Sequence, residues 1–342
     1  MSRMSQISVS VFHFLRKHRE FRTFGFLIAL FVIVGIFNAS YLTPDNMENS
    51  VRSSVVYIIM ATGMTFVLLT GNIDISVGGV LGLSAAVSAT IVRNGGSIVT
   101  AFVAVIVIGL IIGLLNGLGV SVLKIQSFIL TLGMNEVLRV VQVIFQGGRN
   151  VEGLPTSFQR ITQHEILGVS TLSIVVILLV IGIHLFLSMN RKGRYFAAIG
   201  DKEEGAVLAG IPVKRYKIYA FMMSSVCAAI AGLIFASRIG NNIPTTAGLG
   251  YEMTVIAACV LGGVSLAGGV GSVLGATIGA IFMTSISSAL VFLKVDAFWK
   301  DVISGSLLIL IVVFDMLLIH RNNQKAKKQR LNARVLEIRK EM

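Results

Sequence analysis

The feature that most constrains this sequence is a series of long apolar windows that carry almost no charge. Residues 98–115 contain no charged side chain, and residues 172–187 contain His184 as their one ionisable group. Stretches of about 20 such residues can cross the hydrocarbon core of a bilayer as α-helices. Only 13% of the chain is charged, whereas soluble domains average about 25%. A water-soluble fold is therefore excluded, and the chain is integral to a membrane.

The apolar windows predict an all-α, polytopic helix bundle of about ten transmembrane helices. They lie near residues 23–42, 51–70, 79–93, 98–123, 127–146, 168–187, 216–237, 254–266, 274–293 and 302–319. The first is interpreted as an uncleaved helix, because no small-x-small cleavage site ends it. The predicted organisation is an N-terminal cytoplasmic segment (1–22), a transmembrane domain (23–319) and a basic tail (320–342).

The basic residues indicate how the helices are oriented. With the N-terminus inside, the predicted cytoplasmic segments hold 21 Lys and Arg residues and the outer segments hold 7. Positive charge favours the cytoplasmic side, so we expect both termini in the cytoplasm. This pattern also accounts for the net charge of +13 without nucleic acid as a partner. The basic tail is expected either to contact anionic membrane lipid or to be a disordered topogenic segment.

Two segments interrupt the apolar pattern with glycine and polar residues, at 71–79 and 261–275. Backbone without helical hydrogen bonds is tolerated in a membrane only where protein or a water-filled cavity satisfies it. The segments also resemble each other, since VGGVLG at 77–82 recurs as VGSVLG at 270–275. Matching interrupted segments predict two related halves with a transport pathway between them. Chance similarity of Gly/Val-rich helices is the alternative.

The longest predicted cytoplasmic loop covers residues 189–217. From Asp201 onward its composition favours a short amphipathic helix, with acidic residues in the first turn and Gly210 and Pro212 ending it. Such a helix is suited to a groove on another protein. A solvated charged loop is the alternative interpretation.

Four motifs carry a resemblance to a known family. They are LTGNIDISVG at 69–78, KIQSFILTLG at 124–133, GRYFAAIGDKEEGAVLAGIP at 193–212 and LGGVSLAGGVGS at 261–272. The chain resembles permease subunits of the ribose/autoinducer-2 class of carbohydrate ABC importers over about residues 20–320. Within that family it is most similar to autoinducer-2 import permeases, through VEGLP at 151–155, FASRIG at 235–240 and GLGYEM at 248–253.

The resemblance implies a ten-span subunit of the bacterial inner membrane that works in a complex. Its implied partners are a second permease copy or paralogue, cytoplasmic ABC ATPase subunits and a periplasmic solute-binding protein. The implied solute is a sugar or sugar-like molecule of the autoinducer-2, rhamnose or ribose class. The chain contains no G-x-x-x-x-G-K-[S/T] pattern, so we expect no cofactor on it, with ATP and Mg²⁺ on the ATPase. The chain is not expected to be an enzyme.

The resemblance also assigns candidate site residues. The ATPase-coupling loop is assigned to Gly193, Arg194, Gly200, Asp201, Glu203, Glu204, Gly205, Ala206 and Gly210. The residues themselves, rather than the resemblance, suggest the translocation pathway, which we assign to Asn72, Asp74, Ser76, Asn116, Phe128, Thr131 and Asn135 because they lie in or near the interrupted segment and the predicted spans. The alternatives are that Asp74 caps the helix after it and that the other polar side chains hold helices together.

Ionisable residues at membrane depth leave one rival function open. Glu136 and Arg139 are spaced to neutralise each other on one helix. An ion-coupled secondary transporter would instead use Asp74, Glu136 and Asp315 as relay groups. No metal site is expected, because Cys227 and Cys259 have no Cys or His at ligand spacing. A membrane-embedded enzyme is disfavoured, since the five histidines are scattered along the chain.

Overall fold

The computed structural model describes residues 19–166, 169–240 and 242–296, and beyond these 299, 302–303, 305–306, 309–310 and 313. Most of the predicted N-terminal segment, most of the predicted tenth span, Asp315 and the basic tail lie outside the described residues. The described helices are α2 (Arg19–Phe37), η1 (Ala39–Leu42), α3 (Pro44–Leu69), α4 (Val77–Arg93), α5 (Ile98–Ser121), α6 (Ser127–Phe145), α7 (Thr156–Gln163), α8 (Thr171–Met189), α9 (Arg191–Asp201), α10 (Glu203–Leu208), α11 (Val213–Ile239), α12 (Tyr251–Leu261) and α13 (Val273–Phe292).

The prediction of an all-helical bundle is confirmed. Strand pairing among the described residues is limited to two antiparallel two-residue pairs, β1 (Val151–Glu152) with β4 (Asn242–Ile243) and β2 (Glu165–Ile166) with β3 (Val169–Ser170). In the described part of the chain, six helices are long and apolar enough to cross a membrane: α3, α5, α6, α8, α11 and α13. The apolar part of α2 (Thr23–Phe37) and helices α4 and α12 are apolar but shorter.

The interrupted segments explain why two of these helices are short. After α3 ends, the chain runs without helix from Gly71 to Ser76, so α4 begins only at Val77. Likewise α12 ends at Leu261 and the glycine-rich segment that follows is not helical. The two copies of the repeated motif meet their helices differently, because α4 begins at the first residue of its copy and α13 at the fourth residue of its own. The relation between two halves stays a prediction.

One predicted boundary is wrong by seven residues. The helix predicted from residue 51 begins at Pro44, after the N-cap residue Thr43. Proline is favoured in the first turn, since its fixed φ suits the helix and its missing N–H is not needed there. The polar first turns of α3 hid this start from a search for apolar residues.

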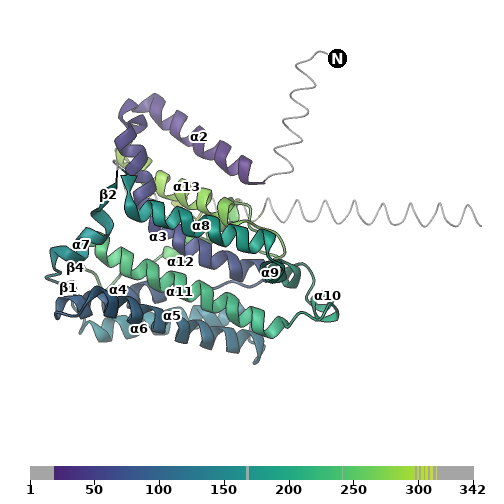
Figure 1. The fold of residues 1–342 in the computed structure, drawn as a ribbon. Helices are drawn as coiled ribbons and strands as arrows, with labels where there is room; N and C mark the ends of the chain where they lie inside the picture. Colours follow the sequence, from purple (N-terminus) through teal and green to yellow (C-terminus); the bar gives the residue numbers. More distant parts are fainter. Residues whose placement is uncertain are drawn as a thin grey trace, which may run out of the picture.

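Helix α11 is at the centre of the bundle, where it packs against α3, α4 and α5 (Figure 1). Its contact with α5 depends on a stripe of small residues. A Cβ atom on Gly113 would lie 2.5 Å from Met222 Cα, and Cβ atoms on Gly109 and Gly117 would lie 2.8 and 2.7 Å from Cα atoms of α11. Small residues at such spacing let membrane helices approach closely.

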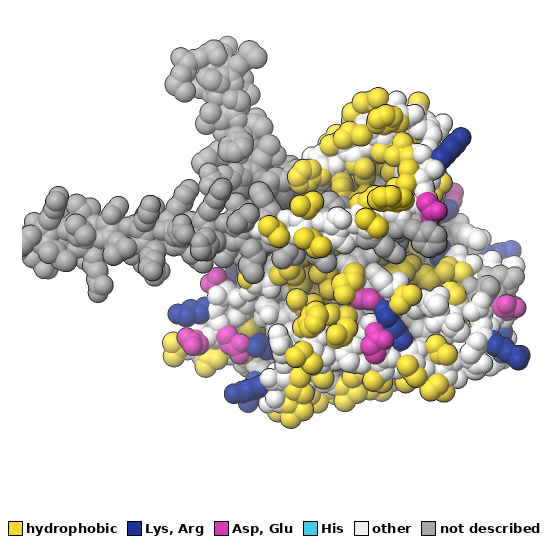
Figure 2. Space-filling model, turned by 180° about the vertical axis from the view of Figure 1, so that it is seen from behind, with side chains coloured by type: hydrophobic (Ala, Val, Ile, Leu, Met, Phe, Trp, Pro, Cys, Tyr) yellow, Lys and Arg dark blue, Asp and Glu magenta, His cyan; other side chains and the backbone are white. Residues whose placement is uncertain are grey.

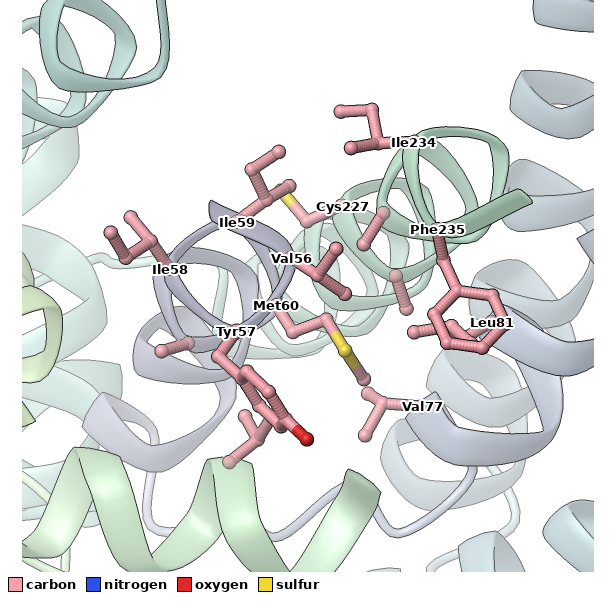
Figure 3. Close-up of a cluster of buried hydrophobic side chains, with 14 of the residues drawn as sticks. Val56, Tyr57, Ile58, Ile59, Met60, Val77, Leu81, Cys227, Ile234 and Phe235 are labelled. Carbon is pink, nitrogen blue, oxygen red and sulfur yellow. The ribbon is translucent and has the colours of Figure 1, made fainter. Parts of the chain in front are cut away.

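The core forms where α3, α4 and α11 meet. Val56 and Met60 of α3, Leu81 of α4 and Cys227 and Phe235 of α11 point toward one another (Figure 3). By contrast, α5, α6 and α8 expose rows of large apolar side chains. Hydrophobic side chains spread over the middle of the face in Figure 2, with most of the charged ones toward its two ends. This distribution suits a protein surrounded by lipid.

The two ends of the bundle differ. Helices α9 and α10 lie at one end, next to the C-terminal end of α3 (Figure 1). Helix α7 and the β1–β4 pair lie at the opposite end.

Candidate functional site

The predicted coupling segment forms two helices rather than one. The sequence predicts a single helix from Asp201, but Asp201 ends α9 and the next helix, α10, begins at Glu203. Between them Lys202 adopts an extended conformation, with φ −158° and ψ 103°. Glu203 and Glu204 occupy the first turn of α10, where their charge complements the helix dipole. Gly193, Arg194 and Gly200 lie on α9.

Helix α10 is fixed on one side and exposed on the other. Lys217 Nζ of α11 lies 2.7 Å from Glu203 Oε2, and Ala206 is buried against Ile199 and Val213. The helix ends at Leu208, and Gly210, the residue after its C-cap, has a φ of +75° that suits glycine. On the free side Leu208 is 89% exposed. An apolar side chain presented this openly next to charged residues is suited to a pocket on another protein.

Helix α9 connects α10 to the bundle. Its Phe196 ring contacts Phe66 of α3 and Tyr216 of α11, each at a centroid distance of 5.1 Å. Gly193 lies so close to the end of α8 that an added Cβ would be 2.0 Å from the carbonyl oxygen of Phe186. Helix α9 is therefore packed closely against α3, α8 and α11.

Both interrupted segments meet α9 at one point, which we call the glycine junction (Gly71, Gly200, Gly268 and Gly269). A Cβ on Gly200 would lie 2.0 Å from the Leu69 carbonyl oxygen, and a Cβ on Gly268 would lie 2.8 Å from Gly71 Cα. The Gly269 N–H donates to that same Leu69 oxygen at 3.0 Å. Three segments that are distant in sequence thus touch backbone to backbone.

Most of the residues assigned to the pathway come together around the segment between α3 and α4, which we call the buried polar cluster (Asp74, Ser76, Asn116, Thr131 and Asn135). Each is at most 1% exposed. Their side chains take the place of the missing helical hydrogen bonds. The Ile75 N–H donates to Thr131 Oγ1 at 3.0 Å, and the Gly79 N–H donates to Asn135 Oδ1 at 2.8 Å.

Within this cluster Asp74 binds the residue that precedes α4. Its Oδ1 accepts from the Ser76 N–H at 3.0 Å and from the Ser76 hydroxyl at 2.5 Å. Asn116 Nδ2 of α5 donates to the same hydroxyl oxygen at 2.9 Å. The bond from Asn116 is an interhelical contact of the kind that the sequence raised as an alternative, whereas Asp74 holds the N-cap residue Ser76 and does not itself cap α4.

Two residues assigned to the pathway lie outside the buried polar cluster. Phe128 is exposed on α6. Asn72 is half-buried and donates to the Thr70 carbonyl and hydroxyl oxygens at 3.1 and 3.0 Å. Solute contact by any of the seven residues stays a prediction.

An ion pair that the sequence did not predict joins α6 to α12. Arg139 Nη2 lies 2.7 Å from Glu252 Oε1, closer than the 3.3 Å that separates Arg139 Nη1 from Glu136 Oε1. Gly78 makes room for it, because an added Cβ there would be 2.1 Å from Glu252 Oε2. Glu252 precedes an apolar run, which is the sequence signal that could have identified it. Among the described residues, no group of three or more His, Cys, Asp or Glu side chains could hold a metal ion.

Comparisons with known proteins give consistent matches along the chain. Residues 46–312 match the family model described as "Branched-chain amino acid transport system / permease component". The autoinducer 2 import system permease protein LsrC of Escherichia coli (strain K12 / DH10B) is 38% identical over 320 residues, which is 93% of each chain. The protein of the same name from Salmonella typhi is 37% identical over 93% of this chain and 92% of its own. No solved structure matches.

These matches confirm the resemblance noted in the motifs. They extend across the helices of the core, both interrupted segments and helices α9 and α10, and the named relatives are transport subunits rather than enzymes. The chain belongs to the family of ABC importer permease components and is homologous to the autoinducer 2 import permease LsrC.

Proposed function

We propose that the chain is one of two permease subunits in an importer of autoinducer 2 or a similar sugar-like molecule. The extent of the similarity to LsrC supports this solute class. The family model is described by a different solute, branched-chain amino acids. Family membership therefore leaves the solute open, and the closer similarity to the named relatives favours autoinducer 2.

The proposed complex contains a second permease copy or paralogue, two cytoplasmic ATPase subunits that bind ATP and Mg²⁺, and a periplasmic binding protein. The chain has about ten spans in the bacterial inner membrane, with both termini and the end that carries α9 and α10 in the cytoplasm. The excess of basic residues in the corresponding segments supports this orientation.

In the proposed mechanism α10 is the contact with an ATPase subunit. The exposure of Leu208 is the observation that carries this assignment. Closure of the ATPase on nucleotide displaces α10 and α9, and the glycine junction passes the displacement to both interrupted segments. The permease subunits then exchange between inward- and outward-open states, which differ in their affinity for the ATPase conformations.

The test is uptake by proteoliposomes that contain the full importer. Labelled autoinducer 2, ribose, rhamnose and leucine are supplied with the binding protein, with and without internal ATP. We expect ATP-dependent accumulation of autoinducer 2 that survives collapse of the membrane potential. Accumulation driven by an ion gradient without ATP would contradict the mechanism, and accumulation of leucine alone would contradict the solute class.

A further inference from the structure

A cavity of about 540 Å³ lies between the first turns of α3 and the last turns of α13. Nine of its eleven described lining residues carry a hydroxyl, amide or carboxylate group, and the other two are Val291 and Phe292. Its volume is within the range of about 300–1,000 Å³ that is usual for sites of small molecules. The cavity is at the opposite end of α3 from the glycine junction.

The polar residues form a stripe on each helix. Asn46, Ser50 and Ser53 follow one another at spacings of four and three on α3, and Thr284 and Ser288 are four apart on α13. Such spacing places them on one helix face. Ser288 Oγ donates to Asn46 Oδ1 at 3.1 Å, so the two stripes face each other. Polar faces in a membrane protein are costly against lipid and line aqueous cavities by preference.

One of these residues is buried with unused hydrogen-bonding capacity. Ser50 is 3% exposed, and its hydroxyl has no hydrogen-bond partner among the described residues. A buried hydroxyl without a partner costs about 1–3 kcal/mol. Because Ser50 lines the cavity, rotation of its side chain would let a ligand hydroxyl supply the missing partner.

We propose that this cavity is a solute-binding site on the transport path, for a small, uncharged, polyhydroxylated molecule. Hydroxyl and amide groups both donate and accept, as a sugar hydroxyl does. Asp45 adds a carboxylate that could accept hydrogen bonds from two adjacent hydroxyl groups of the ligand. No Lys or Arg is among the described lining residues. Val291 and Phe292 form an apolar wall against which the C–H groups of the ligand can pack. This inference rests on the proposed function and names a part of its pathway.

The position of the cavity fits entry of solute from outside. It lies at the end of the bundle opposite α10, which in the proposed orientation is the periplasmic end (Figure 1). The buried polar cluster is different, because its residues are at most 1% exposed and Thr131, Asn135 and the Asn116 amide bond groups of this subunit; Asp74 Oδ2 and Asn116 Oδ1 are buried there without a partner among the described residues. Solute would therefore meet the α3–α13 cavity first.

Two threonines on α13 provide a matched test of the proposal. Thr284 lines the cavity and donates to the Ala280 carbonyl oxygen at 2.9 Å; Thr277 lies outside it and donates to the Val273 oxygen at the same distance. We expect Thr284→Val to lower the maximal ATP-dependent uptake rate of the full importer about tenfold, the effect of losing one hydrogen bond to solute. Thr277→Val should transport as the parent does. Equal rates for the two variants would overturn the proposal.

A second measurement does not depend on transport. Ser287→Cys places a thiol in the cavity, and Ile111→Cys places one on the exposed apolar face of α5; both native cysteines are buried. In intact cells with the full importer, a charged, membrane-impermeant thiol reagent should modify the Ser287→Cys variant at least tenfold faster than the Ile111→Cys variant. The solute identified in the uptake assay should slow that reaction.

Other outcomes of the labelling would overturn the proposal. A Ser287→Cys thiol that is inert, or that forms a disulfide with a second copy of the subunit, would make the cavity a covered subunit interface. The two proposals can fail separately. Uptake without ATP would contradict the proposed function, but it would leave the difference in labelling between the two cysteine variants unchanged.

Discussion

Arg139 on α6 and Glu252 on α12 form an ion pair, with 2.7 Å between Arg139 Nη2 and Glu252 Oε1. Only 7% of the Glu252 side chain is exposed, against 61% for Glu136, the other carboxylate beside this guanidinium. The pair ties two helices that have α4 between them, and it depends on the absence of a side chain at Gly78. The two charges of the pair balance each other where α6 approaches α12.

The first prediction concerns this ion pair. Glu252→Gln removes the buried charge that balances Arg139, and breaking a buried pair costs about 3–5 kcal/mol. Glu136→Gln removes an exposed partner, which is worth about 0–1 kcal/mol. We expect the melting temperature of the purified subunit in detergent to fall clearly for Glu252→Gln and hardly at all for Glu136→Gln. Equal shifts would show that the two carboxylates contribute alike.

The second prediction concerns the glycine junction. Gly200→Ala adds a methyl group where a Cβ would be 2.0 Å from the Leu69 oxygen, whereas at Gly182 of α8 an added Cβ would meet nothing within 4 Å. We expect Gly200→Ala to retain the ATPase subunits but to reduce uptake per ATP hydrolysed at least tenfold. Gly182→Ala is the control and should behave as the parent, since alanine favours a helix. Normal coupling in Gly200→Ala would mean that the junction does not transmit motion.

The third prediction concerns the exposed tip of α10. Leu208→Asp should reduce co-purification of the ATPase subunits about tenfold, because a buried leucine contributes roughly 1.5–3 kcal/mol at an interface. Leu123→Asp is the matched control: Leu123 is 70% exposed and follows α5. Because neither residue is buried, both variants should keep the parental melting temperature. Loss of the ATPase from both variants alike would argue against a specific role of α10.

The fourth prediction separates structural from solute-binding roles in the buried polar cluster. Thr131→Val leaves the Ile75 N–H without its acceptor, at a cost of about 1–3 kcal/mol. Thr62→Val is milder, since the Thr62 hydroxyl donates to the Ile58 oxygen of its own helix. We expect a lower melting temperature for Thr131→Val alone, with an unchanged order of preference among the solutes. A changed preference at normal stability would instead place Thr131 in contact with solute.

The sequence was sufficient for the helical architecture because the relevant signals are local. Apolar windows gave the positions of α5, α6, α8 and α13 to within a few residues. The glycine-rich interruptions also stand out without a structure, since few other residues break apolar runs so strongly. The start of α3 was missed because its first turns are polar, and that polarity belongs to the α3–α13 cavity.

Contacts between distant segments could not be predicted in this way. The i,i+3 rule paired Arg139 with Glu136, whereas the pairing with Glu252 depends on how α12 packs. The exposure of Leu208 and the meeting of Gly71 with Gly200 and Gly268 likewise follow from tertiary structure. The polar residues of the buried cluster were found, but their bonding to the backbone between α3 and α4 was not.

The glycine junction limits how the molecule can respond to a push at α10. Where side chains separate two segments, changes of rotamer can absorb a small displacement of one segment before the other moves. At the glycine junction the backbones touch directly, so we expect the two interrupted segments to move together with α9. Under the proposed mechanism, no side-chain rearrangement at this junction would delay the response of the interrupted segments to the ATPase.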